Sequence, residues 1–373
     1  MSQTKSLSLI GVGDIAGNAI TSIFWFILAT WISPEDFGEL FYLIGIASLA
    51  CSFTLFGNQN TLSVLVSKNI PIHTTLYFIS MVLAFIVSII GIFIFPDYSI
   101  IFLIFGYTVN TLSIGYLLGK QKFKTYSIHT LIQKSLTLIL GIILFLIFGT
   151  DGIIPALTLT YLTFFIIFVK QFKENRIDFS LVRKKIKFIL NNYFIEILTK
   201  SNSHLNKFFI VPILGLAILG YFSLSLQLVN VGLTLTLIVL KYTIPNDSKG
   251  ISTTKLKKFT LLFSIIIAFV GSILSPYIIS DFFPQYDDVT EIVQIIRFSI
   301  IPLTLSRLFL SKLISSEQNK KIILSRIVSI VSFITLIIFL TPTFGIMGLS
   351  YSYMVSVILE CLVLIPNYKK LTF

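Results

Sequence analysis

The sequence is poor in charged residues. Asp, Glu, Lys and Arg make up only 12% of its 373 residues, whereas soluble domains contain about 25%. A surface in contact with water needs such residues, so this composition excludes a large soluble domain. The hydrophobic content of 55% and the mean hydropathy of +0.94 indicate a chain that resides in lipid.

Cysteine is nearly absent. Cys51 and Cys361 are the two cysteines, and both lie within apolar runs, where a thiol is typically a small buried hydrophobic group. A disulfide scaffold is therefore excluded. The sequence also has no cluster with metal-ligand spacing and no nucleophile with a paired base. We therefore expect neither an enzyme nor a bound cofactor or metal.

Apolar runs of about 20 residues recur along the whole chain. As a helix, such a run crosses the ~30 Å hydrocarbon core of a bilayer. The sequence predicts twelve spans in two sets of six, at 7–31, 38–57, 72–95, 98–118, 128–148 and 153–169, then 188–214, 219–240, 259–279, 292–314, 322–340 and 344–364. The first run exceeds the core of a signal peptide and is interpreted as a retained helix. The predicted fold class is an all-α polytopic membrane protein.

The net charge of +12 is explained by the distribution of basic residues over the loops. Loops containing Glu35, Asp151 and Asp281 carry no Lys or Arg, whereas the alternate loops hold nearly all basic residues, most densely at 170–187. The positive-inside rule then places both termini and the basic loops in the cytoplasm, and the protein in the cell (inner) membrane. Because this topology accounts for the charge, nucleic acid is not an expected partner.

The two sets of six are similar in sequence. Residues 37–41 (FGELF) match residues 219–223 (LGYFS) at an offset of 182, and the same offset relates Asp14 to Glu196. Further along, Gly152 corresponds to Gly345. Such a parallel repeat predicts two lobes about an axis along the membrane normal, with a cleft between them.

The repeat sets the expected domain boundaries. The N-terminal six-helix lobe comprises residues 1–169 and the C-terminal six-helix lobe comprises residues 188–373. The basic segment 170–187 is expected to be a cytoplasmic linker. Its second half has the pattern of a short amphipathic helix on the inner leaflet, where anionic membrane lipid attracts it.

Ionisable side chains within the expected spans are functional candidates, because a charge at bilayer depth is costly. Glu196, Lys200, His204 and Lys207 follow one another at intervals of four, four and three residues. On a helix they share a sector of about 80°, so this span is expected to have one polar side. The alternative is a Glu196–Lys200 pair that neutralises itself within a packed bundle.

Two further spans carry polar stripes. Arg297 and Arg307 lie on one face of the tenth span, with Pro302 interrupting the backbone ladder between them. Asp14 and Asn18 share a face of the first span. We regard all four polar side chains as candidates for a central site.

Other ionisable residues lie nearer the ends of the spans. An alternative for Arg297 and Arg307 is that they extend to the nearest membrane interface. Lys134, Lys312 and Glu360 are expected to be interface residues and not members of a site.

Several short motifs resemble one protein family. Residues 31–41 (WISPEDFGELF) resemble the "gpedfGly" signature between helices 1 and 2 of polysaccharide-biosynthesis flippases of the MOP superfamily, which include the Wzx-type O-antigen exporters. Residues 205–210 and 217–224 resemble the junction of helices 7 and 8 in that family. Residues 279–302 and 345–349 are also similar to it. The resemblance covers essentially the whole chain in helix number and orientation.

This resemblance implies two six-helix lobes in a MATE-like V shape that alternate access between the two faces. The implied activity is flipping of a polyprenyl-diphosphate-linked oligosaccharide from the cytoplasmic to the outer leaflet, for O-antigen or capsule-like polysaccharide. Partners would be that glycan, and the glycan polymerase and glycosyltransferases of the same pathway. Cationic side chains would hold the diphosphate, with a histidine on sugar hydroxyls; these are Lys200, Lys207, Arg297, Arg307 and His204. Ion coupling or gating would fall to Asp14, Glu196 and Asn18.

Three alternatives remain open. A cation-coupled multidrug or metabolite antiporter of the same superfamily shares the architecture, although the cavity cations would repel cationic drugs. A peptidoglycan lipid II flippase has the same chemistry with another sugar. A membrane-embedded glycan polymerase or glycosyltransferase fits least well, because the outward loops of this sequence are short.

Overall fold

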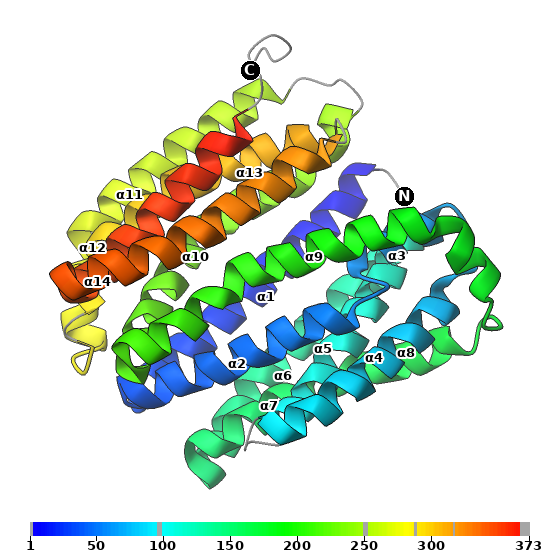
Figure 1. Ribbon diagram of the computed structural model, residues 1–373, viewed down its shortest axis with the longest axis horizontal. Helices are drawn as coiled ribbons and strands as arrows, with labels where there is room; N and C mark the ends of the chain where they lie inside the picture. The colour runs from blue at the N-terminus through cyan, green and yellow to red at the C-terminus, as the bar shows by residue number, and fades with distance from the viewer. Residues whose placement is uncertain (1–2, 95–98, 249–252, 287–288, 316–317, 366–373) are drawn as a thin grey trace. The chain divides into compact units, whose positions relative to one another are not determined.

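The computed structural model describes residues 3–94, 99–248, 253–286, 289–315 and 318–365. Within these ranges all regular elements are helices (Figure 1). The first half contains α1 (Gln3–Trp31), α2 (Pro34–Thr54), α3 (Gln59–Ser67), α4 (His73–Ile94), α5 (Ser99–Gly119), α6 (Phe123–Phe148), η1 (Gly149–Gly152), α7 (Ile153–Thr160) and α8 (Leu162–Phe172). The second half contains α9 (Phe179–Leu214), α10 (Leu216–Ser248), α11 (Thr254–Phe282), α12 (Val289–Ile296), η2 (Arg297–Ser299), α13 (Ile300–Ser315) and α14 (Asn319–Leu364). The predicted all-α fold class is confirmed.

Nine helical stretches among the described residues are long and apolar enough to cross a membrane. Two of these stretches, Phe123–Phe172 and Asn319–Leu364, each contain two of the twelve expected spans. The expected span at 188–214 lies within α9, whose polar residues make it less hydrophobic than the others. The chain is a multi-pass membrane protein, in agreement with its composition. Helices suit this setting because lipid offers no partner for backbone N–H and C=O groups.

Several expected spans are interrupted. The second span ends at Thr54, and a new helix, α3, begins after Asn58, whose side chain accepts a hydrogen bond from Thr61 N. The tenth span is divided into α12, η2 and α13, with the break at Arg297–Ser299. The last two spans are joined in α14 around the non-helical residue Gly345.

The same tight turn joins the fifth and sixth spans of each half. Gly149 (φ 64°, ψ −147°) and Gly345 (φ 54°, ψ −131°) both adopt a conformation that favours glycine. Three residues later, a Cβ on Gly152 would lie 2.2 Å from Leu144 O, and a Cβ on Gly348 would lie 2.4 Å from Leu340 O. The expected correspondence of Gly152 with Gly345 is therefore wrong by three residues, since the repeat pairs Gly149 with Gly345.

The chain forms two compact units. Unit 1 comprises Met1–Phe24 and Leu43–His204, and unit 2 comprises Trp25–Tyr42 and Leu205–Phe373. These units are divided differently from the expected lobes at 1–169 and 188–373, because the ends of α1 and α2 nearest their connection pack within unit 2. The first two thirds of α9 pack within unit 1.

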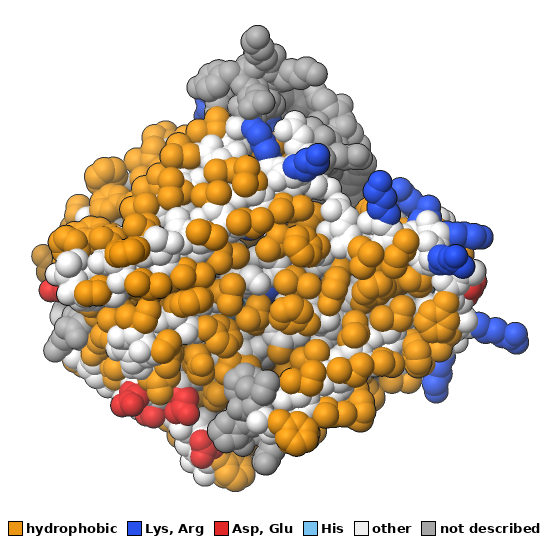
Figure 2. Space-filling view, in the orientation of Figure 1, with side chains coloured by type: hydrophobic (Ala, Val, Ile, Leu, Met, Phe, Trp, Pro, Cys, Tyr) orange, Lys and Arg blue, Asp and Glu red, His pale blue; other side chains and the backbone are white. Residues whose placement is uncertain are grey.

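Each unit has its own hydrophobic core. In unit 1, α3, α4 and α8 pack around α5 (Figure 1), and the buried side chains include Tyr77, Leu112 and Phe164. In unit 2, α10 packs against α12 and α13, with Phe222 and Ile296 among the buried residues. Large apolar side chains also cover most of the face drawn in Figure 2. Such a surface is unfavourable in water and suits the interior of a bilayer.

The connection between α1 and α2 is fixed by local capping and by a distant loop. Ser33 Oγ accepts a hydrogen bond of 3.1 Å from Asp36 N and donates one of 2.7 Å to the Asp36 carboxylate, so it caps α2. Pro34 occupies the first helical position, where its missing N–H costs nothing. Gln285 Nε2 donates to the carbonyls of Ala29 and Ile32, at 2.7 Å each. The C-terminal carbonyls of α1 are thereby satisfied within unit 2.

Helices α2 and α10 meet at two glycines in unit 2. A Cβ on Gly38 would lie 1.9 Å from Leu216 O, and a Cβ on Gly220 would lie 1.9 Å from Pro34 O. The offset of 182 relates Pro34 to Leu216 and Gly38 to Gly220, so the two halves of the contact are equivalent. This reciprocal contact has local two-fold symmetry, and only glycine allows the two backbones to come so close.

Replacing either glycine of the reciprocal contact by alanine is expected to destabilise the protein. The added methyl group meets a backbone carbonyl that cannot rotate away, so we expect Gly38→Ala and Gly220→Ala each to lower the free energy of unfolding by about 3 kcal/mol or more. Thermal unfolding of the purified protein in detergent measures the effect. Gly91→Ala in α4 is the control, because a Cβ there meets open space. Equal stability of Gly38→Ala and Gly91→Ala would show that the helices do not approach so closely.

Candidate functional site

The candidate residues are distributed over both units. Unit 1 contains Asp14, Asn18, Glu196, Lys200 and His204. Unit 2 contains Lys207, Arg297 and Arg307. The polar stripe of α9 therefore begins in unit 1 and ends in unit 2.

Asp14 lies in a polar site between α1 and α6. The Tyr126 hydroxyl donates a hydrogen bond of 2.7 Å to Asp14 Oδ1. Lys134 is a charged neighbour of the same carboxylate. The stem of Lys134 passes close to Gly17, where a Cβ would lie 3.3 Å from Lys134 Cγ. Asn18, one turn beyond Asp14, is exposed.

Helix α6 has a polar stripe that the sequence analysis missed. Its members are Tyr126, Thr130, Gln133, Lys134 and Thr137, which recur at the three- and four-residue spacing of one helix face. The expectation that Lys134 is an interface residue is wrong, because it is half-buried beside Asp14. Its charge was visible in the sequence, but the partner on α1 was not.

The stripe continues into a partly buried network of neutral polar groups. Asn110 Nδ2 donates to Gln133 Oε1 at 3.2 Å, and Gln133 also hydrogen-bonds to Tyr161. Tyr161 in turn hydrogen-bonds to Tyr107, with ring centroids 5.1 Å apart, and Tyr107 bonds to Ser48. Unit 1 therefore has a connected polar interior in which hydroxyl and amide groups satisfy one another.

Helix α9 is held against the break between α2 and α3. Asn58 Nδ2 donates a hydrogen bond of 2.8 Å to Asn192 O, and the Tyr193 hydroxyl donates one of 2.6 Å to Phe53 O. One turn later, Glu196 and Lys200 are half-buried, and both act electrostatically on the buried Cys51 thiol of α2. The first two charges of the stripe therefore lie beside the polar interior of unit 1, and His204, also half-buried, follows them.

Lys207 is buried in unit 2, with 7% of its surface exposed. Its Nζ donates 2.9 Å to Phe41 O and lies 5.1 Å from the centroid of the Phe41 ring. The ammonium group is thus partnered by a carbonyl and an aromatic face, and it links α9 to α2. The four residues of the stripe share one helix, but the structure gives Lys207 a more enclosed environment than Lys200.

Arg297 is also buried, in the η2 break of the tenth span. Its Nη1 donates 3.0 Å to Ser275 Oγ on α11 and lies 3.5 Å from Gly271 O. The guanidinium carbon lies 5.1 Å from the Phe298 ring centroid. The side chain is directed toward α11 within the unit.

Arg307 belongs to a charged cluster inside unit 2. It is half-buried, and its Nη1 donates 3.2 Å to Leu233 O on α10. Its charged neighbours are Arg326 and Glu360, which form an ion pair with each other, and the Tyr353 phenol is adjacent. Two guanidinium groups therefore share one carboxylate, which leaves this interior positive. The expectation that Glu360 is an interface residue is wrong, since only 3% of its surface is exposed.

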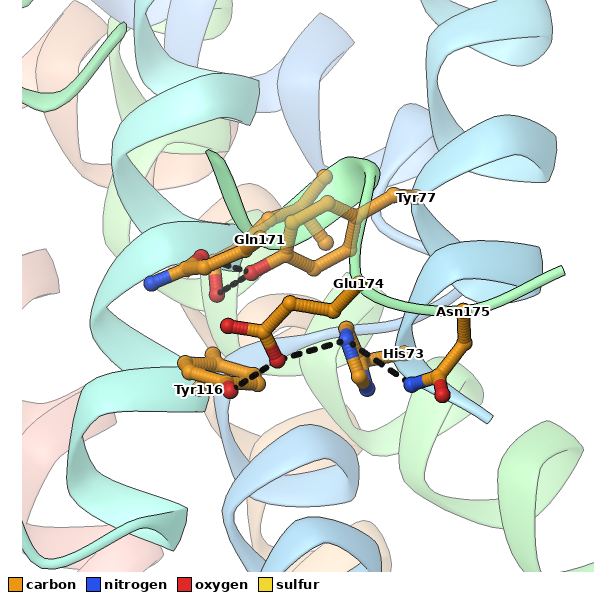
Figure 3. Close-up of polar contacts among 7 residues, drawn as sticks. His73, Tyr77, Tyr116, Gln171, Glu174 and Asn175 are labelled. Carbon is orange, nitrogen blue, oxygen red and sulfur yellow. Dashed lines mark hydrogen bonds and ion pairs between the residues drawn. The ribbon is translucent and has the colours of Figure 1, made fainter. Parts of the chain in front are cut away.

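A second polar cluster in unit 1 lies where α8 ends (Figure 3). His73 Nε2 is 3.6 Å from the Glu174 carboxylate, and the Tyr116 hydroxyl donates to that same carboxylate. The Tyr77 hydroxyl lies 2.6 Å from Gln171 Oε1 and donates 2.9 Å to Leu112 O. These contacts fasten the turn after α8 to α4 and α5. Sequence analysis missed them because His73 and Glu174 are 101 positions apart.

The described part of the chain contains no group of three or more His, Cys, Asp or Glu that could hold a metal ion. Its ionisable groups are partnered instead by hydroxyls, amides, carbonyls and one another. The arrangement suits the binding of ions or polar groups within a membrane protein.

Comparisons with known proteins show the fold. No family model and no curated protein matches the chain in sequence. An inward-facing multidrug resistance MATE family transporter of the MOP superfamily is similar in structure, with a TM-score of 0.70 at 12% identity over 94% of this chain and 92% of that one. Its outward-facing counterpart gives a TM-score of 0.70 at 15% identity over 96% and 93%.

A third similar structure is a MOP superfamily transporter from Pyrococcus furiosus Vc1, for which reversed polarity of the binding pocket suggests a different function. It has a TM-score of 0.69 at 13% identity, over 96% of this chain and 94% of that one. At such low identity the likeness concerns the fold alone. The two-lobe MATE-like fold expected from the sequence is confirmed.

Neutralising the carboxylate of the charged cluster is expected to destabilise unit 2. In Glu360→Gln two neighbouring guanidinium groups lose their counter-charge, and breaking a buried pair in this way costs about 3–5 kcal/mol. We expect a lower unfolding temperature in detergent, with part of the loss restored in the Glu360→Gln, Arg326→Gln double variant. Exposed Glu291→Gln is the control. An additive double variant would argue against a coupled cluster.

Proposed function

We propose that this protein is a membrane transporter that flips a polyprenyl-diphosphate-linked oligosaccharide from the cytoplasmic to the outer leaflet by alternating access. The product would serve surface polysaccharide synthesis of the O-antigen or capsule type. The observation that carries the proposal is the excess of positive charge inside the helical units, at Lys200, Lys207, Arg297 and Arg307. The transporter fold of the similar structures supports it.

The charge fits the chemistry of the proposed substrate. A diphosphate carries negative charge that must be compensated when it leaves water, and arginine and lysine provide this with charge-assisted hydrogen bonds. In unit 2, Arg307 and Arg326 share the single carboxylate of Glu360, so an anion nearby would find net attraction. In unit 1, Lys200 is half-buried next to Glu196 and supplies a second cation. His204, on the same stripe, is proposed to contact sugar hydroxyls.

Asp14, Asn18 and Glu196 are proposed to act in ion coupling or gating. Protonation of Asp14, or binding of a cation to it, would weaken its attraction to Lys134 while the Tyr126 hydroxyl remained close. Such a change alters how α1 is held against α6 within unit 1. A charge-dependent contact of this kind can link an ion gradient to a conformational change.

The membrane orientation and the partners also remain proposals. From the charge of the loops we propose that both termini lie on the cytoplasmic side of the inner membrane. Enzymes that build or polymerise the glycan would act before and after the transporter. Lipid II flipping differs from the proposed reaction only in the sugar.

A multidrug or metabolite antiporter is the second candidate. It is favoured by the similarity to multidrug resistance MATE transporters and by the polar interior of unit 1, where Asp14 supplies a carboxylate. The cationic interior of unit 2 favours an anionic substrate instead. Export of a cationic dye, measured in the same cells, distinguishes the two candidates.

Loss of the cation at Lys200 is expected to slow flipping strongly. In cells lacking the protein, lipid-linked glycan should accumulate on the cytoplasmic leaflet and surface glycan should disappear, with rescue by the wild type. We expect Lys200→Ala to be at least about tenfold slower, the effect of losing roughly 1.4 kcal/mol of charge-assisted binding. Lys68→Ala, at an exposed helix end, is the control and should rescue fully. An unchanged leaflet distribution in the null strain would remove the proposed function, and full rescue by Lys200→Ala would remove this residue from the site.

Replacing Asp14 by asparagine is expected to remove the dependence of transport on an ion gradient. The amide keeps the size of the side chain but cannot change its charge, so the contact with Lys134 no longer responds to protons or sodium. Transport into vesicles is measured with and without an imposed proton or sodium gradient, for Asp14→Asn and for the exposed-site variant Asp281→Asn. A gradient dependence that survives in Asp14→Asn would exclude Asp14 as the coupling group.

A further inference from the structure

Unit 1 carries an open apolar groove between α4 and α8. Its volume is about 310 Å³, and its walls are formed by Phe78, Met81, Val82, Phe85, Phe168 and Phe172. Phe85 and Val82 are exposed by 61% and 43%, so the groove opens at the protein surface. From Phe78 to Phe85 it follows α4 for seven residues, or about 10 Å. Its walls are wholly apolar, as expected for the binding of a hydrocarbon chain.

One end of the groove meets the basic segment 170–187. Phe172, which lines the groove, ends α8 and is followed by the exposed Lys173. The Phe179 ring at the start of α9 packs edge-on against Phe78, with centroids 6.3 Å apart. Exposed basic side chains therefore come soon after groove-side residues on two elements. Lys173 follows Phe172 at the end of α8, and Arg183 lies one turn after Phe179 in α9.

Positive charge dominates this end of the groove. Segment 170–187 contains seven basic and two acidic residues. Of the two acidic residues, Glu174 is held by His73 and Tyr116 (Figure 3). Asp178 accepts a hydrogen bond of 2.8 Å from Ser180 N, and the hydroxyl and N–H of Ser180 lower its pKa. Asp178 therefore stays ionised. The positive charge of the nearby Lys184 acts on this carboxylate and offsets its negative charge.

We propose that the groove and the adjoining basic residues bind one anionic glycerophospholipid, with an acyl chain between α4 and α8 and the phosphate at Lys173 and Arg176. Charge complementarity selects this occupant, because a neutral lipid would fill the groove without using the cations at its end. The site is separate from the cations proposed to bind the diphosphate. It lies where α9 begins, so the bound lipid would steady the helix that carries Glu196 and Lys200.

Lipid binding to the purified full-length protein tests the proposal. The protein in neutral detergent is titrated with phosphatidylglycerol or phosphatidylcholine, and bound lipid is counted by native mass spectrometry. We expect phosphatidylglycerol to bind more tightly. In Lys173→Gln, Arg176→Gln this preference should fall by about 25-fold, since each basic residue near an anionic lipid contributes roughly fivefold. Lys122→Gln, Lys124→Gln, also exposed, is the matched control and should keep the preference.

A second pair of variants tests the groove itself. Val82→Trp fills it, whereas Val331→Trp places the same side chain on an exposed surface of α14 in unit 2. We expect only Val82→Trp to lose the tightly bound phosphatidylglycerol. Both positions are exposed, so both variants should fold normally.

Three results would overturn the proposal. Equal binding of phosphatidylglycerol and phosphatidylcholine would show that lipid covers this surface without selectivity. Equal lipid binding by the two tryptophan variants would show that the lipid does not occupy the groove. Displacement of phosphatidylglycerol by a polyprenyl phosphate at far lower concentration would assign the groove to the isoprenoid. None of these readouts requires transport, so the proposed function stands or fails independently.

Discussion

The reciprocal contact between Gly38 and Gly220 is the constraint on which the arrangement of the chain depends. Because neither residue has a side chain, each helix places its backbone against a carbonyl of the other, and the beginning of α2 becomes part of unit 2. The end of α1 is held there as well, through the hydrogen bonds of Gln285. As a result α1, α2 and α9 each belong to both units. Any rearrangement between the units must therefore bend or slide these three helices near Phe24, Tyr42 and His204.

The polar interiors of the two units are built from equivalent helices but differ in chemistry. In unit 1 the fourth to sixth spans supply mainly hydroxyls and amides, joined through Gln133 and Tyr161, and the charges beside them are Asp14 with Lys134 and Glu196 with Lys200. In unit 2 the corresponding spans supply Arg307, Arg326 and Glu360. A hydrogen-bonded network of neutral groups fixes one arrangement of the interior, whereas an interior with two guanidinium groups per carboxylate attracts an anion. The two halves of the repeat therefore differ in the charge of their interiors.

The spans could be predicted from the sequence because a long apolar run in lipid forms a helix, which satisfies its own backbone groups. The repeat at Gly38 and Gly220 was visible as a sequence motif. The break at Arg297–Ser299 agrees with the interruption expected from Pro302, whose missing N–H leaves the carbonyl of Phe298 without its helical partner. The turn at Gly345 lies between the two last expected spans, but its left-handed conformation was not predicted. Partners far apart in sequence were also missed. In the sequence both Glu360 and Lys134 resemble interface residues. Only the structure shows that Arg326 lies beside Glu360 and that Asp14 of α1 lies near Lys134. Spacing along one helix identifies a polar face, but only packing decides whether Lys207 is enclosed or Lys200 half-exposed.

The hydrogen bonds between Gln285 and the end of α1 have a consequence for biosynthesis. The carbonyls of Ala29 and Ile32 leave the ribosome 256 and 253 residues before their donor. At 5–20 residues per second this interval is roughly 10–50 s. During that time α6, the neighbour of Asp14, has already been made, but the donor for the end of α1 does not yet exist. Until Gln285 is made, these two carbonyls must find other hydrogen-bond partners or remain unpaired, so the end of α1 reaches its final state late in synthesis.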